Sequence, residues 1–235
     1  MDYTALLTVL QQHANPERAA PMQAYMKHRF AYFGIGKPEL ARLCRPFFKD
    51  AAKQPVDWNF VRRCWDDPHR ELQYAALEYL KKMQQHLTPQ DIPRLQMLIT
   101  EKSWWDSADV LDRIVGDIAL RHPEVNTILL AWSTDDNIWL RRVAIDHQLL
   151  RKQRTDTALW ETIICNNLGK KNFSPTKPSA GHCAITAKPT PNGYKILSTA
   201  TVTKWPNSAC AKRGNICRRR PSENMSFNRT KFLRG

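Results

Sequence analysis

The chain has 235 residues, of which 42% are hydrophobic, and this is enough for a globular protein with a sizeable core. Its 36 lysines and arginines outnumber 22 acidic residues and give a formal net charge of +14, a balance that favours nucleic acid as a partner. The six cysteines form no C-x-x-C pair, H-E-x-x-H is absent, and the few glycines form no phosphate-binding loop, so the sequence predicts no metal and no cofactor.

The pattern of the first 173 residues predicts a series of helices. Residues 1–20 contain no long apolar run, so we expect neither a signal peptide nor a membrane span, and a cytoplasmic location. Up to about residue 170, apolar residues recur at helical spacing, as in the stripe Leu72, Ala75, Ala76, Tyr79 and Leu80. Prolines and capping residues divide the pattern into about nine or ten helices. The dividing signals are Asn15-Pro16, Lys37-Pro38, Asp67-Pro68, Thr88-Pro89, His122-Pro123 and Thr134-Asp135-Asp136.

Three segments in this series are similar to one another, and each follows a shorter helical pattern. They begin at Asp66 (DDPHRELQYAALEYL), Ser103 (SWWDSADVLDRIVGDIAL) and Asp135 (DDNIWLRRVAIDHQLL). Their spacing of roughly 32 to 37 residues is typical of solenoids, in which each helix pair buries its apolar face against the next pair. The sequence therefore predicts an all-α fold, an α-solenoid of paired antiparallel helices.

The character of the sequence changes after Phe173. Residues 174–235 hold 12 of the 36 basic residues and one of the 22 acidic residues, so this tail carries a net charge of +11 and residues 1–173 carry +3. The tail is rich in proline and has no helical stripe, so we expect it to be disordered. The predicted organisation is a helical domain, residues 1–173, followed by a basic tail, residues 174–235, that binds nucleic acid nonspecifically or is translated out of frame.

Three stretches of the helical domain resemble the AlkD-type DNA glycosylases, HEAT-like enzymes that excise alkylated purines. The stretches are YMKHRFAYFGIGKPELARL from Tyr25, EKSWWDSADVLD from Glu101 and DDNIWLRRVAIDHQLLRKQRTD from Asp135. They are similar to that family's signature in order and spacing. The resemblance implies a HEAT-like (ARM-type) solenoid whose concave surface binds double-stranded DNA, and an enzyme that acts as a monomer without a cofactor.

The stretch SWWDSAD contains the two residues that the resemblance makes catalytic. Ser103 and Asp106 fit an S-x-x-D capping box, which predicts a helix start and places Trp105 and Asp109, four residues apart, on one helix face. By resemblance, Asp109 stabilises the positive charge that develops on the sugar as a cationic base leaves, and it orients the attacking water. Trp105 then lies against the deoxyribose. Without the resemblance, the same pair would be a core aromatic beside a solvated acid.

Two adjacent arginines follow on the helix predicted near Ile138. Arg141 and Arg142 lie off its apolar stripe, so both are expected on an exposed face, where arginines suit contacts with DNA phosphates. The resemblance places one arginine of this motif in the catalytic cleft, and we favour Arg142, with Arg141 as a DNA ligand. The alternative is that Arg142 only pairs with Asp146 at i+4. His147 lies on the apolar stripe and is predicted to be a core histidine.

Tyr25 and Lys27 match the family's N-terminal edge of the cleft, so the resemblance implies that they bind DNA. The leading functional hypothesis is a glycosylase for 3-methyladenine and 7-methylguanine in duplex DNA, working in base excision repair. The alternatives are a noncatalytic HEAT-like protein that binds DNA structures or other proteins, and an inactive truncated product.

The tail offers a specific explanation for its unusual composition. The residues PSAGHCAIT from Pro178 can be encoded by codons that, read from the third base, give I-G-W-A-L-R-D-Y, a helical segment that resembles the family's continuation. The residues FSPTK from Phe173 are what F-F-T-N-K becomes when one nucleotide is lost. We therefore expect a frameshift after Phe173, a helical domain truncated at its C-terminal side, and a chain that is unstable or inactive.

Overall fold

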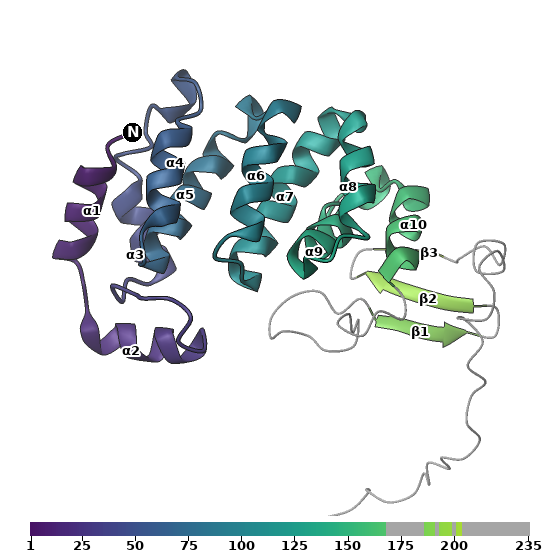
Figure 1. The fold of residues 1–235 in the computed structure, drawn as a ribbon, viewed down its shortest axis with the longest axis horizontal. Coiled ribbons are helices and arrows are strands. Elements are labelled where there is room, and N and C mark those ends of the chain that lie inside the picture. Colours follow the sequence, from purple (N-terminus) through teal and green to yellow (C-terminus); the bar gives the residue numbers. More distant parts are fainter. Residues whose placement is uncertain (168–185, 191–192, 199–200, 204–235) are drawn as a thin grey trace, which may run out of the picture. The chain divides into compact units, whose positions relative to one another are not determined.

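The structure, a computed structural model, describes residues 1–167 in full and, beyond them, the strand backbone of residues 186–190, 193–198 and 201–203 (Figure 1). Residues 1–167 form ten α-helices, and the prediction of an all-helical domain is confirmed. The helices are α1 (Tyr3–Gln12), α2 (Pro16–Tyr25), α3 (Lys37–Cys44), α4 (Trp58–Asp66), α5 (Arg70–Lys82), α6 (Ile92–Thr100), α7 (Trp105–Arg121), α8 (Asn126–Trp132), α9 (Ile138–Asp146) and α10 (Thr157–Asn167). Short 3₁₀ turns are η1 (Ala51–Lys53), η2 (Gln84–His86), η3 (Pro89–Asp91), η4 (Pro123–Val125) and η5 (Lys152–Arg154).

The apolar stripe predicted from the sequence forms the buried face of α5. Leu72, Ala75, Ala76 and Leu80 are completely buried, and Tyr79 is almost so. These positions recur at i, i+3 and i+4, which puts them on one side of a helix. No helix in the described part of the chain is both long enough and apolar enough to cross a membrane.

Capping residues and prolines set where several helices begin. The side chain of Asp57 accepts a hydrogen bond from the Phe60 amide at 2.9 Å before α4, and Asn137 accepts one from the Trp139 amide at 2.9 Å before α9. Helix α2 begins at Pro16, where the missing backbone N–H costs nothing because that donor would be unpaired anyway. The sequence signals for these boundaries therefore act locally.

Helices pack in consecutive antiparallel pairs, α4 with α5, α6 with α7 and α8 with α9, and successive pairs lie side by side (Figure 1). The three similar segments found in the sequence correspond to α5, α7 and α9, the second and longer helix of each pair. Helix α7 contacts both α5 and α9 and so lies at the centre of this arrangement. The predicted solenoid of helix pairs is confirmed.

At Gly116, α7 lies very close to His147, the residue that directly follows α9. A Cβ atom at this position would lie 2.0 Å from the carbonyl oxygen of His147, so only glycine fits. The same carbonyl edge of α7 is held from the other side, because the guanidinium of Arg151 donates to the Gly116 oxygen. The two helices that carry the predicted catalytic residues are therefore in direct backbone contact.

The segment between α2 and α3 is attached to α5 by one buried carboxylate. Glu71 accepts hydrogen bonds from the amides of Phe33, Gly34 and Ile35 at 2.9–3.1 Å and is completely buried. Burial raises the pKa of Glu71, while these backbone hydrogen bonds oppose the shift. The attachment matters for the site because this segment follows directly on Tyr25, at the end of α2.

Residues 174–235 form a second compact unit, which is described here by itself. It contains three antiparallel strands in the order β1-β2-β3: β1 (Thr186–Thr190), β2 (Gly193–Ser198) and β3 (Thr201–Thr203). The expected disorder of the tail stays a prediction, because most of residues 174–235 lie outside the described residues. Half of the strand residues are Thr, Ile, Val or Tyr, which favour extended structure, a signal that the charge and proline content obscured. The position of the expected frameshift lies outside the described residues.

Candidate functional site

Trp105 and Asp109 lie one turn apart near the start of α7, as the sequence predicted. The Asp109 side chain is 24% exposed, and the indole of Trp105 is partly buried. The ring of Tyr25 meets that of Trp105 edge to face, with centroids 6.1 Å apart. An aromatic pair from α2 and α7 therefore lies next to a carboxylate that solvent reaches.

Arg142 holds the carboxylate of Asp109 from the neighbouring helix α9. Its Nε donates to Oδ1 at 2.7 Å and its Nη2 donates to Oδ2 at 3.0 Å, a bidentate pair that fixes the plane of the carboxylate. Burial lowers the pKa of Arg142, but the hydrogen bonds and charge of Asp109, with the charges of Asp146 and Asp112, outweigh burial and raise it overall. The alternative pairing of Arg142 with Asp146 spans 3.9 Å and is the weaker contact.

The expectation that Arg141 is exposed is wrong. Only 6% of Arg141 is exposed, and its Nη1 donates to the carbonyl oxygens of Asp135 at 2.5 Å and Asp136 at 3.0 Å. Because α9 begins at Ile138, Arg141 lies in its first turn, where the side chain folds back onto the preceding loop. Of the two adjacent arginines, Arg142 therefore reaches Asp109 and Arg141 holds the loop.

Three carboxylates gather where α7 meets α9. Oxygens of Asp109, Asp112 and Asp146 all lie within 4.8 Å of one another, close enough to hold a cation. Asp112 is 2% exposed, and burial, followed by the charges of Asp146 and Asp109, raises its pKa well above the usual range. The guanidinium of Arg142 already contacts two of these groups and supplies a positive charge to the cluster. Sequence reasoning did not predict that Asp112 and Asp146 lie beside Asp109. The i, i+3 spacing of Asp109 and Asp112 was a signal, because it places these two residues on one helix face.

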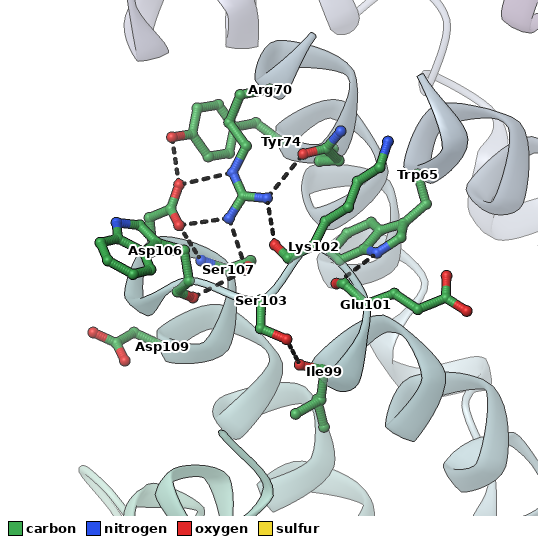
Figure 2. Close-up of polar contacts among 12 residues, drawn as sticks. Trp65, Arg70, Tyr74, Ile99, Glu101, Lys102, Ser103, Asp106, Ser107 and Asp109 are labelled. Carbon is green, nitrogen blue, oxygen red and sulfur yellow. Dashed lines mark hydrogen bonds and ion pairs between the residues drawn. The ribbon is translucent and has the colours of Figure 1, made fainter. Parts of the chain in front are cut away.

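A buried ion pair fixes the start of α7 (Figure 2). Arg70 of α5, which is completely buried, donates to Asp106 through Nε at 3.1 Å and Nη2 at 2.6 Å. It also donates to the Ser107 hydroxyl and the Lys102 carbonyl, and the Tyr74 hydroxyl donates to Asp106 at 2.6 Å. No sequence pattern predicted this network, because each residue is ordinary within its own helix.

The predicted capping box of Ser103 and Asp106 is therefore wrong. The Ser103 hydroxyl donates to the Ile99 carbonyl at 2.7 Å, and no side chain caps α7, which follows Trp104. The carboxylate of Asp106 faces Arg70 instead, since a buried guanidinium without an anionic partner would cost several kcal/mol. The helix still begins where predicted, although for a tertiary reason.

The two residues predicted at the N-terminal edge of the site, Tyr25 and Lys27, differ in their contacts. Tyr25 is 63% exposed and contacts Trp105, as described above. Lys27 is exposed, has a left-handed backbone with φ of 54°, and makes no side-chain hydrogen bond or ion pair within the described part of the chain. The structure thus brings Tyr25, Trp105, Asp109 and Arg142 together, with Lys27 two residues beyond Tyr25.

The helical part of the chain is similar to known proteins. The family model described as DNA alkylation repair enzyme matches residues 6–177, which include every predicted site residue. A solved structure, described as a predicted DNA alkylation repair enzyme from Enterococcus faecalis, is 29% identical, with a TM-score of 0.63. That match covers 68% of this chain and 76% of the other. No curated protein matches the chain.

Proposed function

Since the chain belongs to the family of DNA alkylation repair enzymes, we propose that it is a DNA glycosylase acting in base excision repair. Its proposed substrates are cationic N3- and N7-alkylated purines, such as 3-methyladenine and 7-methylguanine, in duplex DNA. The observation that carries the proposal is the setting of Asp109. Its carboxylate is partly exposed, lies on the face of α7 that bears Trp105, and is held at both oxygens by Arg142 of α9.

The proposed reaction uses the charge that the lesion already carries. The glycosidic bond from C1′ to the purine breaks, and its electron pair leaves with the base and cancels the positive charge there. The sugar becomes positive as the bond breaks. The fixed negative charge of Asp109 stabilises this positive sugar more than the uncharged ground-state sugar. Water then bonds to C1′ and releases its proton through Asp109 to solvent, which leaves an abasic site. This scheme requires neither a metal nor a cofactor.

Arg142 positions the catalytic carboxylate in this scheme. A bidentate guanidinium prevents the Asp109 carboxylate from rotating, so little reorganisation is needed as the sugar becomes positive. The Arg142 side chain is 26% exposed, so its outer edge is also available to a DNA phosphate. Arg141, whose guanidinium holds the loop before α9, supports the site by fixing that loop.

The exposed aromatic pair supplies the surface for the sugar. Tyr25 and Trp105 present ring edges and faces next to Asp109, and such apolar surfaces suit the nonpolar side of a deoxyribose. Lys27 lies beside them as a phosphate contact. We propose that the enzyme approaches the lesion from the sugar side of a duplex bound along a concave face, without extruding the base into a pocket.

The test is release of 7-methylguanine and 3-methyladenine from methylated duplex DNA under single-turnover conditions, for this chain and for its frame-restored form. We expect Asp109→Asn to lower the rate by about 10²–10³-fold and Arg142→Lys by about tenfold or more, because each weakens a fixed electrostatic contact. The matched control is Asp117→Asn, which removes a carboxylate two turns later on α7 that pairs with Arg121. It should leave the rate unchanged.

Two results would contradict the proposal. Equal rates for the unmodified protein and Asp109→Asn would remove Asp109 from the reaction. Tight binding of duplex DNA with no base release from either form would favour the noncatalytic scaffold instead.

A further inference from the structure

A groove opens beside the start of α7, next to the aromatic pair. Its volume is about 500 Å³, and it is formed by three separate connections: the segment after α2, the turn after α4 and the turn before α7. The residues that line it include Arg29, Phe30, Asp66, Pro68, Lys102 and Ser103. None of these residues has a role in the reaction proposed above.

Arg29 is a cation held in place at the edge of this groove. Its guanidinium lies 4.3 Å from the centroid of the Trp104 ring, a cation–π contact that orients an otherwise flexible side chain. Arg29 is exposed, and within the described residues it forms no ion pair. Trp104 precedes Trp105 directly, so their Cα atoms are about 3.8 Å apart. Phe30 of the groove packs against the same buried cluster as Trp104 and Trp105, so the groove lies near the surface proposed for the sugar.

Lys102 supplies a second cation from the opposite edge. Its ammonium donates to the carbonyl oxygens of Asp66 at 2.8 Å and Asp67 at 2.6 Å. An ammonium has three donors, so one N–H is left for a ligand. Burial lowers the pKa of Lys102, and an anion bound beside it would offset that effect.

The acidic residue in the groove is already paired with an arginine. Both carboxylate oxygens of Asp66 accept from Arg62, at 2.5 and 3.0 Å, and Arg62 also binds Glu101 at 2.7 Å. Arg62 is shared between Asp66 and Glu101, and Arg29 and Lys102 are the two further cations that line the groove. Together they favour a small anion with several acceptor oxygens, such as a phosphodiester.

We propose that this groove binds a phosphate of the DNA backbone close to the lesion, with Arg29 as its principal ligand and Lys102 as the second cation. This inference rests on the proposed function, because the same strand must reach Trp105. Phosphates follow one another every 3.4 Å along the axis of one DNA strand. A strand that places its sugar on Trp105 therefore has neighbouring phosphates within reach of Arg29.

The experiment compares the affinity of the full chain for an undamaged duplex at several salt concentrations, by fluorescence anisotropy. We expect Arg29→Gln to weaken binding about three- to tenfold and to reduce the slope of log K against log salt by about 0.9, the value for one lost phosphate contact. Arg29→Lys keeps the charge and should keep the slope. Lys102 is left unchanged, because it also holds the turn after α4.

Arg94→Gln is the matched control. Arg94 lies 5.4 Å from the centroid of the Trp58 ring, pairs with Asp91 at 3.4 Å and borders a different surface pocket, so this variant removes another arginine that lies over an indole. We expect its affinity and slope to match those of the unmodified protein. The basic tail contributes equally to all variants and cancels in the comparison.

Three outcomes decide between the groove and the reaction. The proposed phosphate site would be contradicted if Arg29→Gln left affinity and slope unchanged. It would also be contradicted if Arg29→Gln and Arg94→Gln lost equal affinity. Base release measured at saturating protein, for the unmodified protein and Asp109→Asn, tests the reaction separately. A reduced slope for Arg29→Gln, without base release by any form, would support phosphate binding in the groove and contradict the proposed glycosylase activity.

Discussion

His147 follows α9 directly and is the buried core histidine that the sequence predicted. It is 2% exposed, and its Nδ1 lies 2.7 Å from the Ala144 carbonyl oxygen, which leaves Nε2 buried without a partner within the described residues. Burial lowers the pKa of His147 to about 4; the hydrogen bond to Ala144 opposes the shift and the charge of Arg151 adds to it. The ring is therefore neutral in the folded protein at pH 7.

This residue makes stability depend on pH. The folded-state pKa lies below the value of about 6.5 in the unfolded chain, so protons bind the unfolded state preferentially. The contribution of His147 is present above pH 6.5 and is lost as pH falls toward 4, by up to about 3 kcal/mol. Urea unfolding from pH 7 to 4 gives the free energy of unfolding of the unmodified protein and of His147→Leu. The contribution of His147 is the difference between their pH dependences.

Exposed His13, which forms the same kind of contact with the Val9 carbonyl, provides the control. The variant His13→Leu retains His147 and should lose stability over the same pH range as the unmodified protein. If the stability of His147→Leu fell with pH just as that of the unmodified protein does, His147 would not be the source of the pH dependence.

At the scale of elements, the helices follow from the sequence, while the anchoring of α7 does not. The stripe of α5, the caps before α4 and α9 and the proline start of α2 are local signals, and each boundary lies close to its signal. The start of α7 was predicted for the wrong reason. Arg70 and Asp106 are 36 residues apart in the sequence, and only the packing of α5 against α7 brings them together.

The Arg70–Asp106 pair gives a prediction about stability. Because both side chains are buried, Arg70→Met or Asp106→Leu alone leaves an unpaired buried charge and should lower the free energy of unfolding by about 3–5 kcal/mol. The double variant should lose less than the sum of the single losses, since it removes both charges. Urea unfolding of the four proteins measures the coupling.

The exposed pair of Lys81 and Glu78 is the control, because Glu78→Gln should cost less than about 1 kcal/mol. Strictly additive losses for Arg70 and Asp106 would show that the two charges do not stabilise each other. Base release by the Arg70 variant should also fall, since Arg70 fixes the helix start that carries Trp105.

At the scale of the whole molecule, the two units differ in sequence character as well as in structure. The helical unit ends at Phe173 and the family match at residue 177, close to where the frame change is expected. If one nucleotide is missing after Phe173, the original protein continues with further helices in place of the present tail. A solenoid that has lost its terminal helices exposes an apolar face and becomes less stable.

Restoring the frame tests this hypothesis. We expect the frame-restored protein to unfold at a higher temperature than the present chain, because the last helix pairs cover that face, and to release 7-methylguanine faster. Thermal unfolding and base release on the two proteins measure both effects. Equal stability and equal rates would contradict the frameshift, as would a gene in which no one-base shift opens a helical frame.

The sequence alone determined the helical class, the repeat of helix pairs and the pairing of Trp105 with Asp109 on one helix face, because each depends on residues within a few turns of one another. The tertiary structure decided which arginine meets Asp109. Arg141 and Arg142 are adjacent and chemically identical, and the packing of α7 against α9 brings Arg142 to the carboxylate, while Arg141 binds the loop before α9. Contacts between distant segments also placed Asp106 against Arg70 and Arg29 over Trp104, since such contacts depend on how helices pack and leave no periodic signal in the chain.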